Sequence, residues 1–480
     1  MKTRSRPAPP PPPPADAALA WWDCYASLAN LWWSRRTGSL PADDARLQQL
    51  VATARAQSPF YRKLYSRLPA GDVPLTQLPT VDKAALMKHF DAWCTDRRVR
   101  LAGVNAFLSD RTRIAEPYLG AYHVWKSSGT SGTPGIFLQD SHAMAVYEAL
   151  VLAQWENGLL DARGASRMWS ASGRAALVVA DGDHFASITL WKHLGHANPA
   201  IEHRSFSVLD PMPRLVAGLN VYQPAFLASY PSVLRLLAHE QAAGRLAIAP
   251  AIIWSGGEFL GERSRLALED AFGCRVMNEY GTSECLSIAF GCREGWLHVN
   301  SEWVILEAVD AAGRPVPPGE LSHTTLVTNL ANRVQPIIRY DLGDRVVVGP
   351  ARCACGSPLP AIRVEGRTDA TLEMRTAGRR IVRLAPLALS TVVEEAAGEH
   401  RFQVAQVAPD RLHVRFEAQR DASRARIWSL ASTALRQYLD GQSLANVKIG
   451  LDRHRPRADS CSGKFHAVTV EMPCRPSRRA

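Results

Sequence analysis

The sequence has no apolar run of the roughly 18 residues that a membrane-spanning helix needs, so no membrane span is expected. It also lacks the apolar segment of a signal peptide, because the basic N-terminus runs into prolines at positions 9–14. Together these absences predict a cytoplasmic protein. The proline-rich residues 1–16 are expected to form a disordered tail rather than packed core.

Cysteines are few and carry no sign of a disulfide framework, since the nine of them are odd in number and widely spread. In a reducing compartment they are free thiols or metal ligands. Acidic residues are outnumbered, which gives a formal net charge of +11, but much of the excess lies in the two tails and at 453–457. No aromatic-interleaved basic stripe accompanies it, so nucleic acid is not an expected partner. A solvated basic surface or a docking face for an acidic protein remain the two interpretations.

The chain is too long for one hydrophobic core, so two or more domains are expected in its 480 residues. Between about 145 and 300, buried-strand patterns alternate with helix patterns, and Ser232 is a candidate N-cap for one of these helices. This order predicts a layered α/β domain with a largely parallel sheet, in which ligands bind at the carboxyl ends of the strands. The expected strands are 176–180, 225–229, 251–254 and 274–277, and the expected helices are 233–243 and 261–272.

A change of pattern near 366–369 indicates a boundary, followed by about a hundred residues of mixed helices and strands. We therefore predict a large layered α/β domain and a small, mobile α+β domain. The expected divisions are a tail at 1–16, a large domain at 17–367, a small domain at 368–470 and a basic tail at 471–480.

The segment 127–135 combines five hydroxyl side chains with three glycines and holds no large side chain. Such a loop lets the backbone approach a ligand and offers N–H and O–H donors to an anion, for which a polyphosphate is the natural choice. It is not a Walker A loop, because no Gly-Lys-Ser/Thr follows it. A flexible linker is the alternative, but the loop lies between two apolar, strand-like segments.

Six motifs follow one another in a fixed order: SSGTSGTPG at 127–135, SGGE at 255–258, NEYGTSE at 278–284, RYDLGD at 339–344, GRTD at 366–369 and SGK at 462–464. This order resembles the adenylate-forming superfamily of acyl-CoA synthetases, adenylation domains and luciferases. Within it, Gly135, the Tyr-Pro-Ser segment at 230–232 and Cys-Ala-Cys-Gly at 353–356 are most similar to the branch of phenylacetate–CoA ligases and deazaflavin-adenylating synthetases.

The resemblance implies a two-step reaction with MgATP. A small carboxylic acid, expected to be aromatic, attacks the α-phosphorus and releases pyrophosphate, and a nucleophile then takes the acyl group and releases AMP. The sequence leaves three acceptors open: CoA, the pantetheine of an acyl carrier protein, or an amine. Two other functions also remain open, namely a nucleotidyltransferase that leaves AMP on its product and a non-catalytic nucleotide-binding homologue. The oligomeric state is open as well, and a homodimer is compatible with the sequence.

The resemblance also assigns roles to single residues. Thr282 is expected at the α-phosphate, Glu284 at Mg²⁺, and Lys464 at the negative charge that grows in the adenylation transition state. Asp369 is the expected hinge that lets the small domain bring Lys464 in and out. The remaining expected nucleotide-binding residues are Ser127, Ser128, Gly129, Thr130, Ser131, Gly132, Thr133, Gly256, Gly257, Glu258, Asn278, Glu279, Tyr280, Gly281, Asp344 and Arg367.

Candidates for the acid pocket are Tyr230, His184, Phe185 and Trp254, although plain core packing explains Phe185 and Trp254 equally well. A separate group, Cys292, His298, Cys353 and Cys355, has the three thiolates and one imidazole that can hold a structural Zn²⁺ tetrahedrally. The alternative there is a set of buried free thiols beside a turn.

Overall fold

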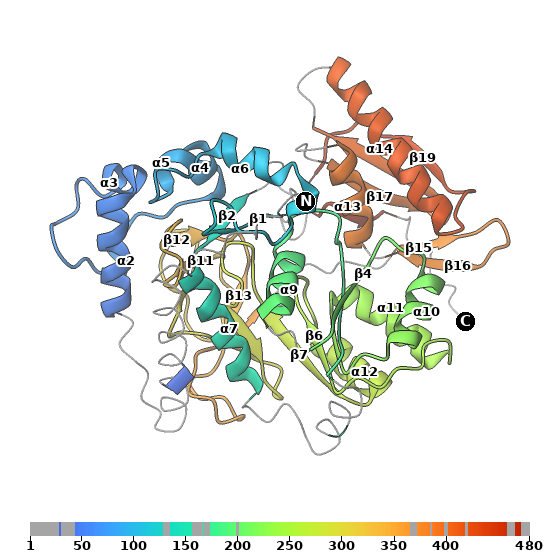
Figure 1. Ribbon diagram of the computed structural model, residues 1–480, viewed down its shortest axis with the longest axis horizontal. Coiled ribbons are helices and arrows are strands. Elements are labelled where there is room, and N and C mark those ends of the chain that lie inside the picture. Colours follow the sequence, from blue (N-terminus) through green and yellow to red (C-terminus); the bar gives the residue numbers. More distant parts are fainter. Residues whose placement is uncertain are drawn as a thin grey trace, which may run out of the picture.

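The computed structural model describes most of the chain. The described residues are 28–29, 44–127, 135–155, 166, 173–197, 201–364, 372–384, 386–397, 402–417, 421–457 and 466–471. They form a large domain that ends with a strand at Val364 and a small domain that begins with a strand at Leu372. The predicted fold class, a large layered α/β domain followed by a smaller α+β domain, is confirmed (Figure 1).

Short helices begin the described part of the large domain and pack on its later strands. Tyr61 and Trp93 both donate to the carbonyl of Pro336, at 3.0 and 2.8 Å, and both side chains are fully buried. These contacts join segments far apart in the sequence into one core. The elements are α2 (Asp44–Gln57), α3 (Pro59–Leu64), η1 (Leu75–Gln77), α4 (Lys83–Lys88), α5 (Phe90–Trp93), α6 (Leu101–Leu108) and η2 (Arg111–Arg113).

A nine-stranded sheet forms the centre of the large domain, in the order β13-β14-β9-β8-β7-β6-β5-β3-β4. Strands β4, β3, β5, β6 and β7 are parallel, and the others continue the sheet in antiparallel fashion. The strands are β3 (Ala175–Val179), β4 (His203–Ser207), β5 (Phe226–Ser229), β6 (Ile252–Ser255), β7 (Arg275–Tyr280), β8 (Ala289–Gly291), β9 (Leu297–Val299), β13 (Val346–Val348) and β14 (Ala361–Val364).

Both faces of the parallel part are covered, which explains why β3, β5 and β6 are mainly apolar rather than alternating. Ala176 and Val178 of β3 face the core shared with helices α10 (Met212–Tyr222), α11 (Pro231–Ala242) and α12 (Glu262–Phe272). Leu177 and Val179 face the opposite side, where Ile188 and Trp191 of helix α9 (Ala186–Ala197) pack. The two-residue period of a strand thus divides β3 between two cores.

Two smaller sheets complete the large domain. Strands β10 (Val304–Val309), β11 (Thr324–Asn329) and β12 (Ile337–Asp341) form an antiparallel sheet. Strands β1 (His123–Lys126) and β2 (Ile136–Gln139) form an antiparallel hairpin, after which helix α7 (Ser141–Trp155) follows. No described helix is both long and apolar enough to cross a membrane.

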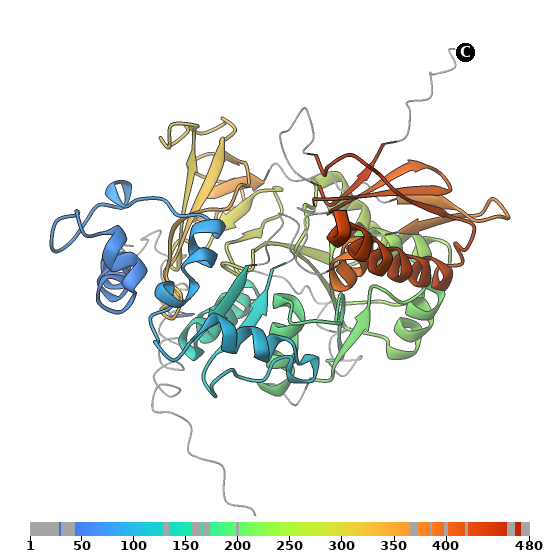
Figure 2. The same ribbon diagram turned by 90° about the horizontal axis from the view of Figure 1, so that it is seen from above.

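The small domain has its own core, built from a four-stranded sheet, two helices and a hairpin. It lies beside α10 and α11 of the large domain in both views (Figures 1 and 2). At this contact, Gln442 donates to the carbonyls of Leu209 and Asp210, both at 3.3 Å. The elements are β15 (Leu372–Arg375), β16 (Ile381–Leu384), α13 (Pro386–Ala397), β17 (Phe402–Ala408), β18 (Arg411–Phe416), α14 (Asp421–Gly441), β19 (Lys448–Leu451) and β20 (Val468–Val470).

Candidate active site

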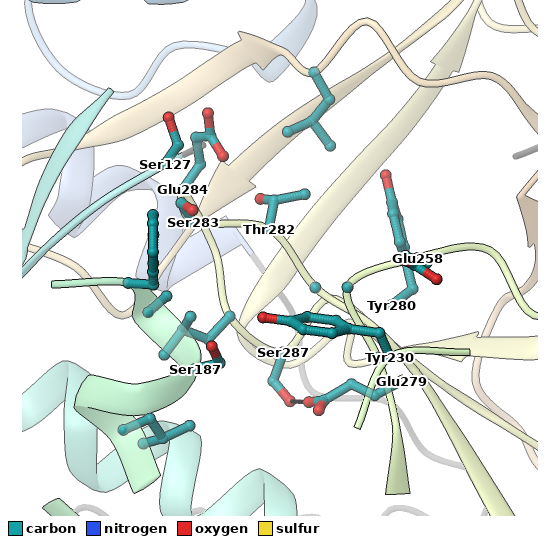
Figure 3. Close-up of a pocket in the computed structure, with 18 of the residues that line it drawn as sticks. Ser127, Ser187, Tyr230, Glu258, Glu279, Tyr280, Thr282, Ser283, Glu284 and Ser287 are labelled. Atoms are coloured by element: carbon teal, nitrogen blue, oxygen red, sulfur yellow. Dashed lines mark hydrogen bonds between the residues drawn. The ribbon is translucent and has the colours of Figure 1, made fainter. Parts of the chain in front are cut away.

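A cavity of about 1250 Å³ opens at the carboxyl ends of β5, β6 and β7 (Figure 3). This is where a parallel sheet is expected to bind ligands, because the loops that leave its strands converge there. Thr391 of α13 also lines it, so the small domain contributes to its wall. The expected site residues that line it are Ser127, Phe185, Tyr230, Trp254, Gly256, Gly257, Glu258, Asn278, Glu279, Tyr280, Gly281, Thr282, Glu284 and Asp344.

The β1–β2 hairpin anchors the hydroxyl-rich loop at both ends. The N–H of Ser127 donates to the carbonyl of Gly135 at 2.8 Å, and the N–H of Gly135 donates to Oγ of Ser127 at 2.8 Å. A Cβ on Gly135 would lie 2.5 Å from the ring of Phe137, so no larger residue fits there without a shift. Residues 128–134 lie outside the described part of the chain, and Ser128, Gly129, Thr130, Ser131, Gly132 and Thr133 are among them.

The loop after β7 is tightly folded and carries Thr282 and Glu284. Thr282 and Cys285 exchange backbone hydrogen bonds of 2.9 and 3.1 Å, and Trp125 holds the carbonyl of Ser283 at 2.9 Å. A Cβ on Gly281 would lie 1.7 Å from the carbonyl oxygen of Leu286. Only glycine therefore permits this loop path, which turns Thr282 and Glu284 into the cavity.

Glu284 is nearly buried, at 7% exposure, and is fixed from two sides. Its Oε1 accepts a 2.7 Å hydrogen bond from the hydroxyl of Tyr340, and its backbone carbonyl accepts one of 3.2 Å from Asn329. Among the described residues, no hydrogen bond reaches its other oxygen, Oε2. A carboxylate oxygen held at a cavity wall fits the hard oxygen ligands that Mg²⁺ prefers.

Asp344 lies in a turn after β12 and accepts a 2.9 Å hydrogen bond from the hydroxyl of Tyr280 at Oδ2. Burial, and then the charge of Asp344, raise the pKa of Tyr280 well above its usual value, so this phenol stays a donor. The pair links the loop after β7 to the segment after β12, and it places an aromatic face and a carboxylate side by side.

The turn after β6 brings Gly256, Gly257 and Glu258 to the cavity rim. Gly257 has a φ of +78°, and a Cβ there would approach the ring of Tyr230 to 3.1 Å. Glu258 accepts from the backbone N–H and the hydroxyl of Ser232, both at 2.8 Å. Ser232 was expected as the N-cap of its helix, but α11 begins at Pro231 and its N-cap is Tyr230. Ser232 instead ties that helix to Glu258.

One side of the cavity is aromatic. Trp191 of α9 stacks against Phe226 of β5 with ring centroids 6.2 Å apart, and Phe226 lies 6.1 Å from Trp254 of β6. Trp254 donates a 2.7 Å hydrogen bond to Glu279. All four side chains line the cavity. The sequence patterns did not single out Trp191 and Phe226, because nothing local distinguishes them from ordinary core aromatics.

His184 does not reach the cavity, although it was expected in the acid pocket. Its side chain is fully buried, its Nε2 lies 2.9 Å from the carbonyl oxygen of Asp110, and its ring packs 5.4 Å from that of Phe107. The next residue, Phe185, does line the cavity. Three further expected residues, Arg367, Asp369 and Lys464, lie outside the described part of the chain.

Charged residues that the sequence did not indicate lie where the two domains meet. Lys126 pairs with Asp183 at 2.6 Å, and Arg111 lies 3.8 Å from Asp183 and 3.9 Å from Glu395 of α13. A Cβ on Gly182 would lie 2.6 Å from Oε1 of Glu395. The small domain therefore closely approaches the segment after β3, at the edge of the cavity.

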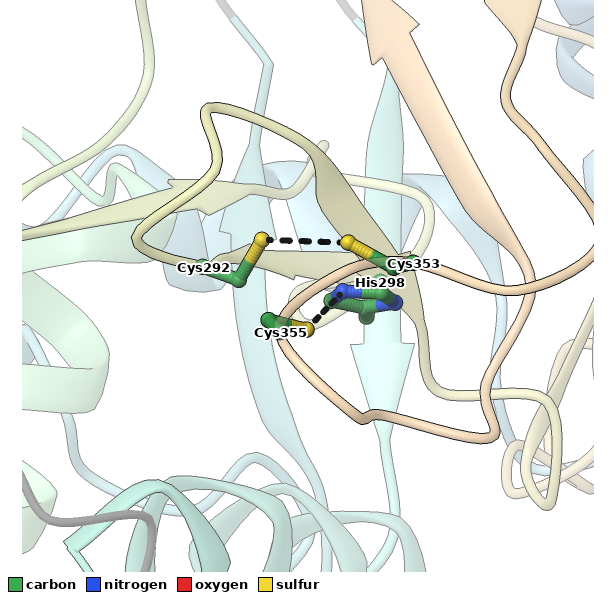
Figure 4. A group of neighbouring side chains, drawn as sticks. All are labelled: Cys292, His298, Cys353 and Cys355. Carbon is green, nitrogen blue, oxygen red and sulfur yellow. Dashed lines mark hydrogen bonds between the residues drawn. The ribbon is translucent and has the colours of Figure 1, made fainter.

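The four expected metal ligands come together away from this cavity (Figure 4). All four donor atoms of Cys292, His298, Cys353 and Cys355 lie within 4.8 Å of one another. The antiparallel pairing of β14 with β9 brings the segment after Cys355 to His298. Nδ1 of His298 lies 3.0 Å from the carbonyl of Leu359, which fixes Nδ1 as the protonated nitrogen and turns the lone pair of Nε2 toward the thiols.

The spacings within this cluster agree with a tetrahedral zinc site. Zn–S bonds of about 2.3 Å place two thiolates about 3.8 Å apart at the corners of a tetrahedron. Sγ of Cys292 and Sγ of Cys353 are 3.8 Å apart, and Nε2 of His298 is 3.2 Å from Sγ of Cys355. The N–H of Ser357 donates to Sγ of Cys355, a contact that stabilises a thiolate. The residues present therefore fit the metal.

No protein-family model matches the chain. Protein CapK from Staphylococcus aureus is 28% identical over 133 residues, which is 27% of this chain and 28% of that protein. The chain thus matches little more than a quarter of the length of this relative. Crystal structures of 2-hydroxyisobutyryl-CoA ligase are similar over nearly the whole chain. The complex with 2-HIB-AMP and CoA in the thioesterification state has a TM-score of 0.57 at 20% identity, covering 96% of this chain and 94% of that one.

An open conformation of the same ligase with 2-HIB-AMP and CoA has a TM-score of 0.52 at 19% identity, covering 89% of this chain and 90% of that one. At this level of identity, the similarity shows that the two proteins share a fold.

Proposed function

We propose that the protein is an ATP-dependent, AMP-forming ligase of a small carboxylic acid. The observation that carries the proposal is the convergence of Ser127, Thr282, Glu284 and Asp344 around one cavity that also has an aromatic side. A hydroxyl-rich loop, a carboxylate for Mg²⁺ and a carboxylate for a ribose suit MgATP, whereas the aromatic side suits an acid with an apolar body. The shared fold with 2-hydroxyisobutyryl-CoA ligase supports this proposal.

In the proposed reaction, the hairpin loop at 127–135 holds the β- and γ-phosphates, and Thr282 donates to the α-phosphate. Asp344 accepts from the ribose hydroxyls, beside Tyr280 as a face for the adenine. Glu284 would hold Mg²⁺, which neutralises phosphate charge when bound. The acid carboxylate attacks the α-phosphorus, the bond to the bridging oxygen breaks, and pyrophosphate leaves with that oxygen.

Lys464 is the proposed catalytic lysine of this step. The transition state carries extra negative charge on the phosphorus oxygens, which a positioned ammonium stabilises. Lys464 lies four residues before β20 of the small domain. We propose that this domain turns about Asp369 between the two half-reactions, and the contacts of Glu395 with Arg111 and Gly182 belong to one of the resulting arrangements.

We propose a thiol, either CoA or a pantetheine arm, as the acyl acceptor, because two of the ligase structures that share the fold over most of the chain contain CoA. The thiolate sulfur attacks the acyl carbonyl, the bond to the phosphate oxygen breaks, and AMP leaves. Incubation with MgATP and a panel of aryl, aryl-acetic and alkyl acids tests the proposal, with and without CoA. Free AMP and pyrophosphate support it, whereas AMP retained on the product favours a nucleotidyltransferase.

We also propose that Cys292, His298, Cys353 and Cys355 hold a structural zinc ion. The cluster lies on β9 and in the loops beside it, and its four side chains would fill the tetrahedral coordination of a structural zinc ion. Metal analysis of the purified protein should find about one zinc per chain. Cys353→Ser should lose it, whereas Cys274→Ser, which changes a cysteine outside the cluster, should keep it. A full-length protein with no bound zinc, purified without chelators, would refute the assignment.

A further inference from the structure

The carboxylate of Glu279 lies on the aromatic side of the cavity. Its Oε2 accepts a 2.7 Å hydrogen bond from the indole N–H of Trp254. Its Oε1 accepts one of 2.5 Å from the hydroxyl of Ser287 (Figure 3). These two donors fix the carboxylate without enclosing it. Glu279 is half-buried and lines the cavity.

The strand register places Glu279 on the same face as the aromatic residues. Neighbours Glu279 and Tyr280 point to opposite faces of β7, and Glu279 shares its face with Met277. Met277 pairs with Trp254, and Trp254 pairs with Ala228, which lies in the core beneath α9. Tyr280 meanwhile reaches Asp344 on the proposed nucleotide side. Glu279 is thus turned toward the proposed acid and away from the ribose.

Glu279 has no cationic partner among the described residues. Both of its hydrogen bonds come from neutral groups, and Lys126, which also lines the cavity, is paired with Asp183. Burial raises the pKa of the Glu279 carboxyl group, and the hydrogen bonds from Ser287 and Trp254 oppose that shift. A carboxylate in an apolar pocket is costly unless something compensates its charge, and a ligand can supply that compensation.

The surroundings of Glu279 define what else the ligand must carry. Trp191, Phe226 and Trp254 form the aromatic wall, and Leu177 and Ala228 add apolar surface. A ligand body that contacts these side chains is an aromatic ring or an apolar chain. A donor group at the end of that body could then reach Glu279, where it would meet both an acceptor and a negative charge.

We infer that Glu279 determines substrate specificity and selects a carboxylic acid whose apolar body carries a hydrogen-bond donor, preferably an ammonium group, away from the reacting carboxylate. This inference rests on the proposed function, since it assumes that the aromatic side holds the acid. A site that is built to bind a hydrogen-bond donor discriminates strongly against an analogue without that donor. When such an analogue binds, the charge of the carboxylate is left uncompensated. A single charged hydrogen bond corresponds to a discrimination of about 10- to 100-fold.

The test uses matched acids that differ only in the donor. Benzoate, phenylacetate and 3-phenylpropanoate are each compared with their para-hydroxy, para-amino and para-aminomethyl forms by pyrophosphate release. The wild-type protein should prefer an aminomethyl or hydroxy acid over its parent by at least about tenfold in kcat/KM. Glu279→Gln should lose the preference for the ammonium group, and Glu279→Leu should reverse the order in favour of the parent acid.

Ser287→Ala is the matched control, because it removes one hydrogen bond to Glu279 and leaves the charge in place. It should retain the order of preference. An order that is the same in the wild-type protein and in both Glu279 variants would overturn the inference. Equilibrium binding of the same acids, measured by calorimetry, separates this result from failure of the proposed function. No pyrophosphate with any acid would refute adenylation, while the binding order in wild type and Glu279→Leu would still decide the role of Glu279.

Discussion

Replacing Gly281 by alanine should damage both the stability and the activity of the protein. The added Cβ would lie 1.7 Å from the carbonyl oxygen of Leu286, whereas ordinary contacts begin near 3.4 Å. The obstacle is backbone and cannot rotate away, so the loop after β7 must move by well over an ångström. Overpacking of this kind costs about 3 kcal/mol or more, which corresponds to a fall in Tm of roughly 4 °C or more for a domain of this size.

The same displacement carries Thr282 and Glu284 away from their positions at the cavity. Misplacing reacting groups by about 1 Å can lower a rate by about 100-fold. We therefore expect Gly281→Ala to lose at least that factor in acid-dependent pyrophosphate release. Thermal unfolding followed by circular dichroism and a pyrophosphate assay measure the two effects on the same preparation.

Gly256→Ala is the control for stability. A Cβ at this position would be 3.7 Å from the nearest atom, the carbonyl oxygen of Glu279, which is an ordinary contact. Its Tm should change by less than about 2 °C, since substitutions without a clash usually cost within about 0.5 kcal/mol. A Gly281→Ala protein with wild-type Tm and activity would refute the close packing described for this loop.

Three further outcomes are expected. Lys464→Ala should lower adenylation by at least about 100-fold while ATP still binds, as measured by pyrophosphate release and calorimetry; unchanged release would exclude the lysine from the reaction. Removing the metal, by chelation or by Cys353→Ser, should lower Tm by several degrees, and Cys274→Ser should not. The hydrogen bond from Arg415 lowers the pKa of Glu471 in the folded protein. The ionised Glu471 therefore stabilises the fold at pH values above its usual pKa near 4.5, and this stabilisation is lost as the pH falls through the lower pKa of the folded state. At pH 7, the free energy of unfolding of Glu471→Gln, measured with urea, should therefore be about 1–2 kcal/mol below that of the wild-type protein. On acidification to pH 3 the variant should lose less stability than the wild-type protein does. Equal losses in the two proteins would contradict this.

The central sheet was predictable from sequence because local patterns determine its elements. The runs expected at 176–180 and 251–254 agree with β3 and β6 to within one residue at each end. Buried parallel strands are apolar throughout and are bounded by glycine and polar residues, which makes them visible. The helix stop at Gly273 was equally local, since that residue takes the left-handed conformation with a φ of +59°.

Long-range contacts set the limit of prediction. Ser232 looked like a helix cap, yet it pairs with Glu258, which lies 26 residues away along the chain. His184 looked like a pocket residue, yet it is held against the carbonyl of Asp110 from a separate segment. In both cases the polar side chain fits the predicted role when only the neighbouring sequence is considered. Its actual hydrogen-bond partner is determined by the tertiary fold.

The metal-ligand cluster shows the opposite outcome. The donor types alone suggested that the residues belong together, but the two halves are separated by more than fifty residues of sequence. Pairing of β14 with β9 closes that distance, and no local pattern announces that strand order. The residue types predicted the group, and only the fold could bring its four donor atoms within 4.8 Å of one another.

Exchange of labelled pyrophosphate into ATP tests the central claim most directly, because it reports acid activation without requiring the acceptor to be known. Full-length protein with Mg²⁺, ATP and the panel of donor-bearing aromatic acids should exchange label only when a suitable acid is present. Glu284→Gln and Lys464→Ala should abolish most of that exchange. If no acid supports exchange although the protein binds ATP, the cavity binds a nucleotide without activating an acid, and the proposed function is wrong.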